Sequence, residues 1–412
     1  MPGSTPQFDL DAVVVGGCGH VGLPLAIALA SRGQRVGIYD LNQAAVDLVN
    51  GGALPFQEDG ALEPLQGALA SGALVASTDP AVISRAETVV IVVGTPVDEH
   101  LNPNPHAVGR SIEGAMEHYR EGQLVVLRST VYPGVTRNVE KLFARHGVEV
   151  DVAFCPERIA EGKAMTELFT LPQIVSGRTQ EVRDRAARLF GTLTPQVVEL
   201  EPEEAELAKL FTNTWRYIKF AAANQFYVMA NDHGLDFERI RQALALDYPR
   251  AADMPGAGFA AGPCLFKDTM QLAAFSDNSF VLGHSAMLVN EGLPLYVVTQ
   301  LERTLDLENT RVGILGMAFK GESDDIRSSL SYKLKRILEF RAREVLCTDP
   351  YVTVDDSLLP LAEVLERADV LVLAAPHRAY RDLAGTLGDT VVVDIWGLLG
   401  QGTTVGTTGT VG

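Results

Sequence analysis

An apolar strand that runs directly into a glycine-rich turn and an alanine-rich helix constrains this chain most. The stretch DAVVVGGCGHVGLPLAIALASRG fills residues 11–33 and carries the spacing GxGxxG on Gly17, Gly19 and Gly22. The first glycine permits a tight turn, the second lets backbone approach a pyrophosphate, and the third lets the helix pack on the strand. The pattern predicts the first βαβ unit of a dinucleotide-binding sheet. The alternative is a glycine turn that serves packing alone.

The next apolar strand, RVGIYD, ends in Asp40. A carboxylate at this position accepts hydrogen bonds from the ribose hydroxyls of the adenosine and repels a 2′-phosphate. Because no arginine follows in LNQAAVDLV, the pattern favours NAD over NADP.

Two α/β patterns flank a long helical middle. Helical patterns run from Pro202 to about Leu235 and from about Asn278 to Leu307, and a second strand-and-helix series without GxGxxG follows. A chain of 412 residues is also too long for one core. We therefore predict an α/β fold with two Rossmann-like parallel-sheet domains joined by long helices. The expected divisions are 1–201 for NAD binding, 202–308 for a central helical domain with the cysteine loop, 309–400 for the second sheet and 401–412 for a disordered tail.

Charge and cysteine usage exclude several classes of function. The formal net charge of -18 argues against a nucleic-acid partner, which needs a basic face. No run of eighteen apolar residues and no basic leader is present, so we expect neither a membrane span nor a signal peptide. The four cysteines lack CxxC spacing, which favours a reducing cytoplasm and predicts no metal site.

The loop GAGFAAGPCLFKD, residues 256–268, is the main candidate for chemistry. A thiol at Cys264 with the ammonium of Lys267 nearby can ionise and act as a nucleophile. If a helix begins here, Asp268 lies four residues after the cysteine on the same face. The alternative is a buried structural cysteine beside a solvated charge pair.

Polar residues elsewhere form further candidates. Lys209 and Asn213 share one face of a largely apolar helix, where a lysine is costly without a partner. Glu157 and Glu161 are also four residues apart. They indicate either a site that binds ligand or orders water, or the ordinary start of a helix. Strand ends deliver Thr95 and Thr130, and the first turn of the second unit carries Lys320 and Arg327, cations suited to phosphate or ribose.

These motifs together resemble the UDP-glucose/GDP-mannose dehydrogenase family over about residues 10–397. The matching segments are GGCGHVGLPLA, NGGALPFQEDG, VVGTP, RSTVYPG, CPERIAEG, ELAKLFTN, GPCLFKD, GILGMAFKGESDDIRSS and TDP. Enzymes of this family oxidise the C6 alcohol of a nucleotide sugar to a carboxylate and reduce two NAD. The resemblance implies an NAD domain, a helical middle that makes a homodimer, and a carboxyl-terminal domain for the UDP-sugar.

The resemblance also implies roles for individual residues. Cys264 would attack the aldehyde, Lys209 and Asn213 would stabilise the oxyanion, and Asp268 would handle the alcohol proton. Glu157 would act as base in thioester hydrolysis, and Thr130 would order water or the nicotinamide. The implied cofactor-binding residues are Gly17, Gly19, His20, Val21, Gly22, Asp40, Thr95, Thr130 and Arg327. The implied substrate-binding residues are Glu157, Arg158, Glu161, Lys209, Asn213, Arg250, Phe259, Gly262 and Lys320, with Arg250 reaching the substrate of the second subunit.

The sugar and two other function classes stay open at this point. Pro263 stands directly before Cys264, and Ala260 and Ala261 replace part of the usual glycine run. The segments VNEGLP and APHRAY resemble the UDP-N-acetylhexosamine branch, whereas GPCLFKD resembles the UDP-glucose branch. A two-electron hydroxyacid dehydrogenase of the 6-phosphogluconate or 3-hydroxyacyl type would leave Cys264 without a role. A non-catalytic NAD-binding protein would not need Lys209, Asn213, Cys264 and Asp268.

Overall fold

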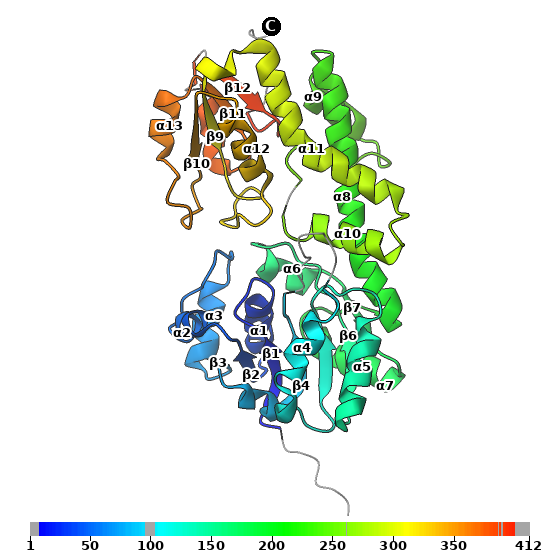
Figure 1. The fold of residues 1–412 in the computed structure, drawn as a ribbon. Coiled ribbons are helices and arrows are strands. Elements are labelled where there is room, and N and C mark those ends of the chain that lie inside the picture. Colours follow the sequence, from blue (N-terminus) through cyan, green and yellow to red (C-terminus); the bar gives the residue numbers. More distant parts are fainter. Residues whose placement is uncertain (1–7, 95–103, 261, 386, 389, 400–412) are drawn as a thin grey trace, which may run out of the picture. The chain divides into compact units, whose positions relative to one another are not determined.

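The chain folds into two compact units, with the boundary between Thr212 and Asn213 (Figure 1). The structure is a computed structural model and describes residues 8–94, 104–260, 262–385, 387–388 and 390–399. The predicted site residue Thr95 and the predicted tail 401–412 lie outside these residues.

The first unit is built on a six-stranded parallel sheet in the order β3-β2-β1-β4-β5-β6. The chain starts in the middle of the sheet, and the strand order reverses between β1 and β4, which is where such sheets open a ligand crevice. The strands are β1 Leu10–Val15, β2 Val36–Tyr39, β3 Leu74–Ser77, β4 Ala86–Ile91, β5 Leu124–Leu127 and β6 Asp151–Phe154, and a separate parallel pair consists of β7 Gln173–Ser176 and β8 Val197–Leu200.

Helices cover both faces of this sheet, so its strands are apolar on both sides. Along β1, Ala12 and Val14 belong to one core, and Val13 and Val15 belong to the other. The helices are α1 Gly22–Ser31, α2 Gln43–Asn50, α3 Leu62–Ala70, α4 Ala107–Glu113, α5 Val135–His146, α6 Ala164–Thr170 and α7 Gln180–Gly191, with short 3-10 helices at Pro80–Arg85 and Met116–His118.

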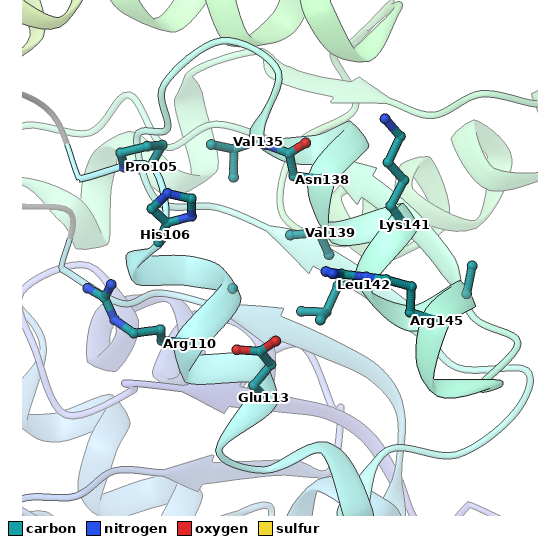
Figure 2. A pocket seen from close by; sticks show the side chains of 12 residues that line it. Pro105, His106, Arg110, Glu113, Val135, Asn138, Val139, Lys141, Leu142 and Arg145 are labelled. Atoms are coloured by element: carbon teal, nitrogen blue, oxygen red, sulfur yellow. The ribbon is translucent and has the colours of Figure 1, made fainter.

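An open groove of about 920 Å³ lies between α4 and α5 on this unit (Figure 2). Its lining includes the exposed side chains of Arg110, Glu113, Lys141 and Arg145. It contains none of the predicted site residues.

The second unit combines long helices with a smaller parallel sheet. Its four strands follow the order β10-β9-β11-β12 and are β9 Arg311–Leu315, β10 Glu344–Thr348, β11 Val370–Leu373 and β12 Val391–Asp394. The helices are α8 Pro202–Asp232, which begins in the first unit, α9 Phe237–Ala245, α10 Leu265–Phe275, α11 Val281–Thr304, α12 Leu330–Glu339 and α13 Leu361–Arg367, with 3-10 helices at Leu307–Asn309 and Arg378–Gly385.

The long helices and the second sheet share one core. Ala223 and Tyr227 of α8 belong to the same apolar cluster as Leu293 of α11 and Val312 of β9. The predicted fold class, two parallel sheets joined by long helices, is confirmed. Among the described helices, none combines the length and apolar composition needed to cross a membrane.

Candidate active site

The glycine turn after β1 has the geometry of a dinucleotide cradle. A Cβ placed on Gly17 would lie 2.7 Å from the carbonyl oxygen of Val14, and one on Gly22 would lie 2.6 Å from the Cα of Gly17. Both positions therefore need glycine for packing. Among the described residues, a Cβ on Gly19 would meet nothing closer than 4.0 Å. Since the protein itself does not require a glycine at residue 19, the open position fits the close approach of a ligand.

The start of α1 carries no negative charge that would repel an anion. Val21 occupies the N-cap position without a side-chain cap, and the first turn contains no acidic residue. The positive end of the helix dipole and the absence of acidic side chains in the first turn suit the pyrophosphate of NAD. These residues fit the predicted cofactor.

Asp40 ties the turn to the end of β2. Its carboxylate accepts hydrogen bonds from the amide of Cys18 at 2.9 Å and from the amide of Asn42 at 3.0 Å. A carboxylate has about four lone-pair positions, so two remain for ribose hydroxyls. The side chain is half-buried, and its contact with the ribose stays a prediction.

His20, beside this turn, contacts two segments distant in sequence. Its ring lies 4.0 Å from the ring of Phe56, and its Nδ1 lies 3.6 Å from the carboxylate of Glu161. The structure therefore brings a predicted cofactor residue next to a predicted substrate residue.

The CPERIAEG segment is held by a buried arginine that the sequence analysis did not single out. Arg128, which directly follows β5, is completely buried and pairs with Glu157. The guanidinium also donates to the carbonyl of Cys155 at 3.1 Å and to Gln173 Oε1 at 3.0 Å. The sequence feature that could have pointed to Arg128 is a charged residue at the end of the apolar strand QLVVLRST. Thr130, two residues further on, is half-buried.

In the second unit, α10 begins at the cysteine loop. Cys264 is exposed at the N-cap position of this helix, so the alternative of a buried structural cysteine does not hold. The positive end of a helix dipole favours a thiolate over a thiol. Because the helix begins directly after Cys264, the condition for Cys264 and Asp268 to share a face is met.

A buried carboxylate lies one turn below the cysteine. Asp268 is completely buried, and its Oδ2 accepts a hydrogen bond from Asn213 Nδ2 at 2.5 Å. The Nζ of Lys267 lies 3.6 Å from Oδ1 of the same carboxylate. Lys209, four residues before Asn213, is buried and lies on the same face of α8. The structure thus joins Asn213 of α8 to the helix that follows Cys264, a contact that the sequence did not indicate.

The cysteine loop is also fixed from its amino-terminal side. Asn224 of α8 donates to the carbonyl of Gly258 at 3.0 Å and accepts from its amide at 2.9 Å. Gly262 has φ +102°, and a Cβ there would lie 2.5 Å from the ring of Phe319. Phe259 between them is buried. A Cβ on Gly258 would lie 2.4 Å from the ring of Trp396, so residues 258 and 262 both need glycine.

The predicted cations of the second unit contact their sequence neighbours. Arg327 pairs with Asp325, with the closest atoms at 2.5 Å, and Lys320 Nζ lies 5.6 Å from the ring centroid of Phe319. Arg250 is exposed, and its Nε donates to the hydroxyl of Tyr248 at 2.9 Å.

A dinucleotide cradle in a parallel sheet and a cysteine at a helix start, backed by a buried Asn–Asp pair, define an NAD-dependent dehydrogenase. Three domain models of one family match the chain: an NAD binding domain over residues 11–194, a central domain over 203–291 and a UDP binding domain over 313–401. The chain belongs to the UDP-glucose/GDP-mannose dehydrogenase family. This confirms the predicted family, the oxidoreductase class and the cofactor NAD.

Individual relatives resemble nearly the whole chain. The UDP-N-acetyl-D-mannosamine dehydrogenase of Pyrococcus horikoshii is 31% identical over 385 residues, which is 90% of each chain. A solved structure of the UDP-D-ManNAc dehydrogenase from this organism superposes with a TM-score of 0.85 at 28% identity, over 92% of this chain and 93% of that one. A UDP-glucose dehydrogenase from Pyrobaculum islandicum gives 0.84 at 28% identity over 95% of both chains.

Proposed function

We propose that this chain is an NAD-dependent UDP-sugar 6-dehydrogenase that oxidises the C6 alcohol of a UDP-N-acetylhexosamine or UDP-glucose to the uronate. The observation that carries the proposal is the exposed Cys264 at the start of α10, one turn above the buried Asn213–Asp268 pair. Relatives named for UDP-N-acetyl-D-mannosamine and for UDP-glucose support a UDP-sugar as the substrate, and both sugars stay candidates.

The first oxidation removes a hydride from C6 and a proton from the alcohol oxygen. NAD, when bound, accepts a hydride in each of the two oxidations. Asp268, acting with Lys209 through a water, takes the alcohol proton. Lys209 and Asn213 donate hydrogen bonds to the oxygen on which negative charge grows in the transition state. Asp268 is completely buried, which suits a site that excludes bulk solvent.

The second oxidation proceeds through the cysteine. The sulfur of Cys264 forms a bond to the aldehyde carbon as the aldehyde oxygen takes up a proton, which gives a thiohemiacetal. The thiohemiacetal then loses its C6 hydride and its hydroxyl proton and becomes a thioester. Water then breaks the C–S bond, releasing the carboxylate and returning the thiol. Covalent attachment keeps the aldehyde from diffusing away between the two oxidations.

We also propose a homodimer formed through the central helices. Large apolar side chains are exposed on and around α8, α9 and α11, and apolar side chains gathered on one set of elements are typical of an interaction surface. They are Phe226, Met229, Leu235, Ile240, Leu244, Leu246, Tyr248, Val281, Leu282, Leu288 and Leu295. Arg250 lies beside Leu246 and Tyr248 in the sequence, as expected of a residue that contacts a second subunit. The three-part division at residues 201 and 308 and a cytoplasmic location are part of the same proposal.

The test is NADH formation by the purified protein with UDP-glucose, UDP-N-acetylglucosamine, UDP-N-acetylmannosamine, UDP-galactose and GDP-mannose. Two NADH per sugar, with uronate as product, are expected for one UDP-sugar. One NADH per substrate without uronate would instead favour a two-electron dehydrogenase. NAD binding without turnover of these sugars or rarer ones would contradict the proposal.

A further inference from the structure

Glu206 is a buried carboxylate that the proposed mechanism does not use. It lies near the start of α8 and is only 1% exposed. Its Oε2 accepts a hydrogen bond from the amide of Gly134 at 2.6 Å, and its Oε1 accepts from the amide of Thr136 at 2.8 Å and from the hydroxyl of Thr136 at 2.6 Å. A charge in a protein interior is strongly unfavourable unless such bonds hold it. The carboxylate therefore has one favoured place, at the beginning of α5.

The beginning of α5 has no cap of its own. Gly134 occupies the N-cap position with φ +96° and offers no side chain, and the first turn contains no acidic residue. The first amides of a helix need acceptors, and the positive end of the helix dipole favours a negative charge. Glu206 supplies both, although it lies 70 positions after Thr136 in the sequence.

The helix start that Glu206 caps is also the end of the loop that carries Thr130. At the beginning of this loop, the hydroxyl of Ser129 donates to the carbonyl of Val93 at 2.7 Å. At its end, the amide of Gly134 is held by Glu206. The position of Thr130 therefore depends on α8 as well as on the strands of the sheet.

Glu206 also fixes the part of α8 that carries Lys209. Residues three apart in a helix share a face, and Lys209 lies about 4.5 Å further along the helix axis. Lys209 is buried. Ala205, the neighbour of Glu206, belongs to the same apolar core as Val131 of the Thr130 loop. A change in the bonds of Glu206 would therefore move Lys209 relative to Thr130.

We infer that Glu206 is a positioning residue that fixes Lys209 relative to the Thr130 loop through its cap on α5. The inference rests on the proposed function, which gives Lys209 and Thr130 their roles. Glu206 acts through these two residues and not on the reacting atoms, since its hydrogen bonds run to the start of α5.

The experiment changes this contact from both sides. E206Q puts an NH2 group, which cannot accept, in place of one carboxylate oxygen. T136V removes the hydroxyl donor, and T136S keeps it. E203Q is the matched control, because Glu203 lies one turn earlier and pairs with Arg137 of α5 at 2.9 Å, but its side chain is 36% exposed.

Four quantities are measured with the UDP-sugar that the wild type accepts. They are KM for the UDP-sugar, KM for NAD, kcat per NAD-binding site, and the isotope effect on kcat when the sugar carries deuterium at C6. Titration with NAD counts the sites. Dividing by this count removes molecules that are not folded, so a loss of stability alone leaves kcat per site and the isotope effect unchanged.

For E206Q we expect kcat per site to fall by about tenfold or more, because a misplacement of about 1 Å can cost about 100-fold. Both KM values should stay near those of the wild type, since Lys209 acts on charge that grows in the transition state. The isotope effect should rise as hydride transfer limits the rate more. T136V should show the same changes to a smaller extent, and T136S and E203Q should resemble the wild type.

The inference is overturned if E206Q loses NAD-binding sites but keeps the wild-type kcat per site and isotope effect. It is also overturned if E203Q loses as much kcat per site as E206Q. If E206Q does not fold, T136V decides, and wild-type values for T136V then overturn the inference. A wild type that forms no NADH with any UDP-sugar would contradict the proposed function instead, and this is seen before any variant is compared.

Discussion

The glycines of the first turn differ in why glycine stands there: some are required by packing, and one is not. Gly22 packs directly against the backbone of Gly17, whereas the space beside Gly19 is open. The GxGxxG pattern therefore contains positions that packing requires and a position, Gly19, that packing does not require, and the two kinds can be tested independently.

We predict different defects for G19A and G22A. G22A should lower the free energy of unfolding by about 3 kcal/mol, because its Cβ would overlap fixed backbone. G19A should keep the wild-type stability but weaken NAD binding by about tenfold or more, a cost of about 1.4 kcal/mol. Chemical denaturation and NAD titration of each variant measure the two effects. Equal loss of stability in both variants would contradict a ligand-facing Gly19.

At the scale of elements, a buried Asp–His pair joins the loops at the carboxyl ends of β9, β10 and β11. Asp349 accepts from His377 Nε2 at 3.1 Å and from the amides of Met317 and Ala318. The imidazole accepts at Nδ1 from the amide of Glu322 at 3.0 Å. Burial alone would raise the pKa of the Asp349 carboxyl, but the bonds from His377 and the backbone together hold this pKa below its usual range.

The lowered pKa predicts how stability depends on pH. A carboxyl whose pKa is lower in the folded state stabilises the fold above its unfolded pKa, and this contribution is lost as pH falls through the folded value. The wild type should therefore lose stability as the pH falls below about 4. D349N should be less stable than the wild type at pH 7, but it should lose less stability than the wild type when the pH falls below about 4. Urea midpoints at several pH values measure this. Parallel pH curves for the two proteins would contradict it.

The sequence predicted elements better than it predicted contacts between them. The strand, glycine turn and helix around Gly19 were predictable because their signals lie within one short stretch. Spacing placed Cys264 and Asp268 on one face if a helix began there, and the helix is present, but the pairing of Asn213 with Asp268 was not predicted. The pairing of Arg128 with Glu157 spans 29 residues, and that of Glu58 with Gly162 spans 104. No local pattern encodes such partners, so only the folded sheet reveals them.

At the scale of the whole molecule, the apolar surface of the central helices predicts a dimer. Leu246 is 74% exposed within this surface, and Phe340, just after α12, is 91% exposed outside it. An apolar side chain buried between subunits should resist replacement by a charge, whereas a solvated one should accept it.

L246E should therefore dissociate the dimer, and F340E should not. Light scattering coupled to gel filtration gives the mass of each variant, with the wild type as reference. A wild type that is monomeric at micromolar concentration would contradict the proposed dimer. So would an L246E protein that keeps the wild-type mass.

The central claim is that one cysteine carries the second oxidation. The decisive measurement is NADH and uronate formed per sugar by the wild type and by C264A, with the UDP-sugar that the wild type accepts. We predict two NADH and one uronate for the wild type, and for C264A no uronate and at most one NADH per sugar, because no thiohemiacetal can form. Full uronate formation by C264A at the wild-type rate would contradict the account.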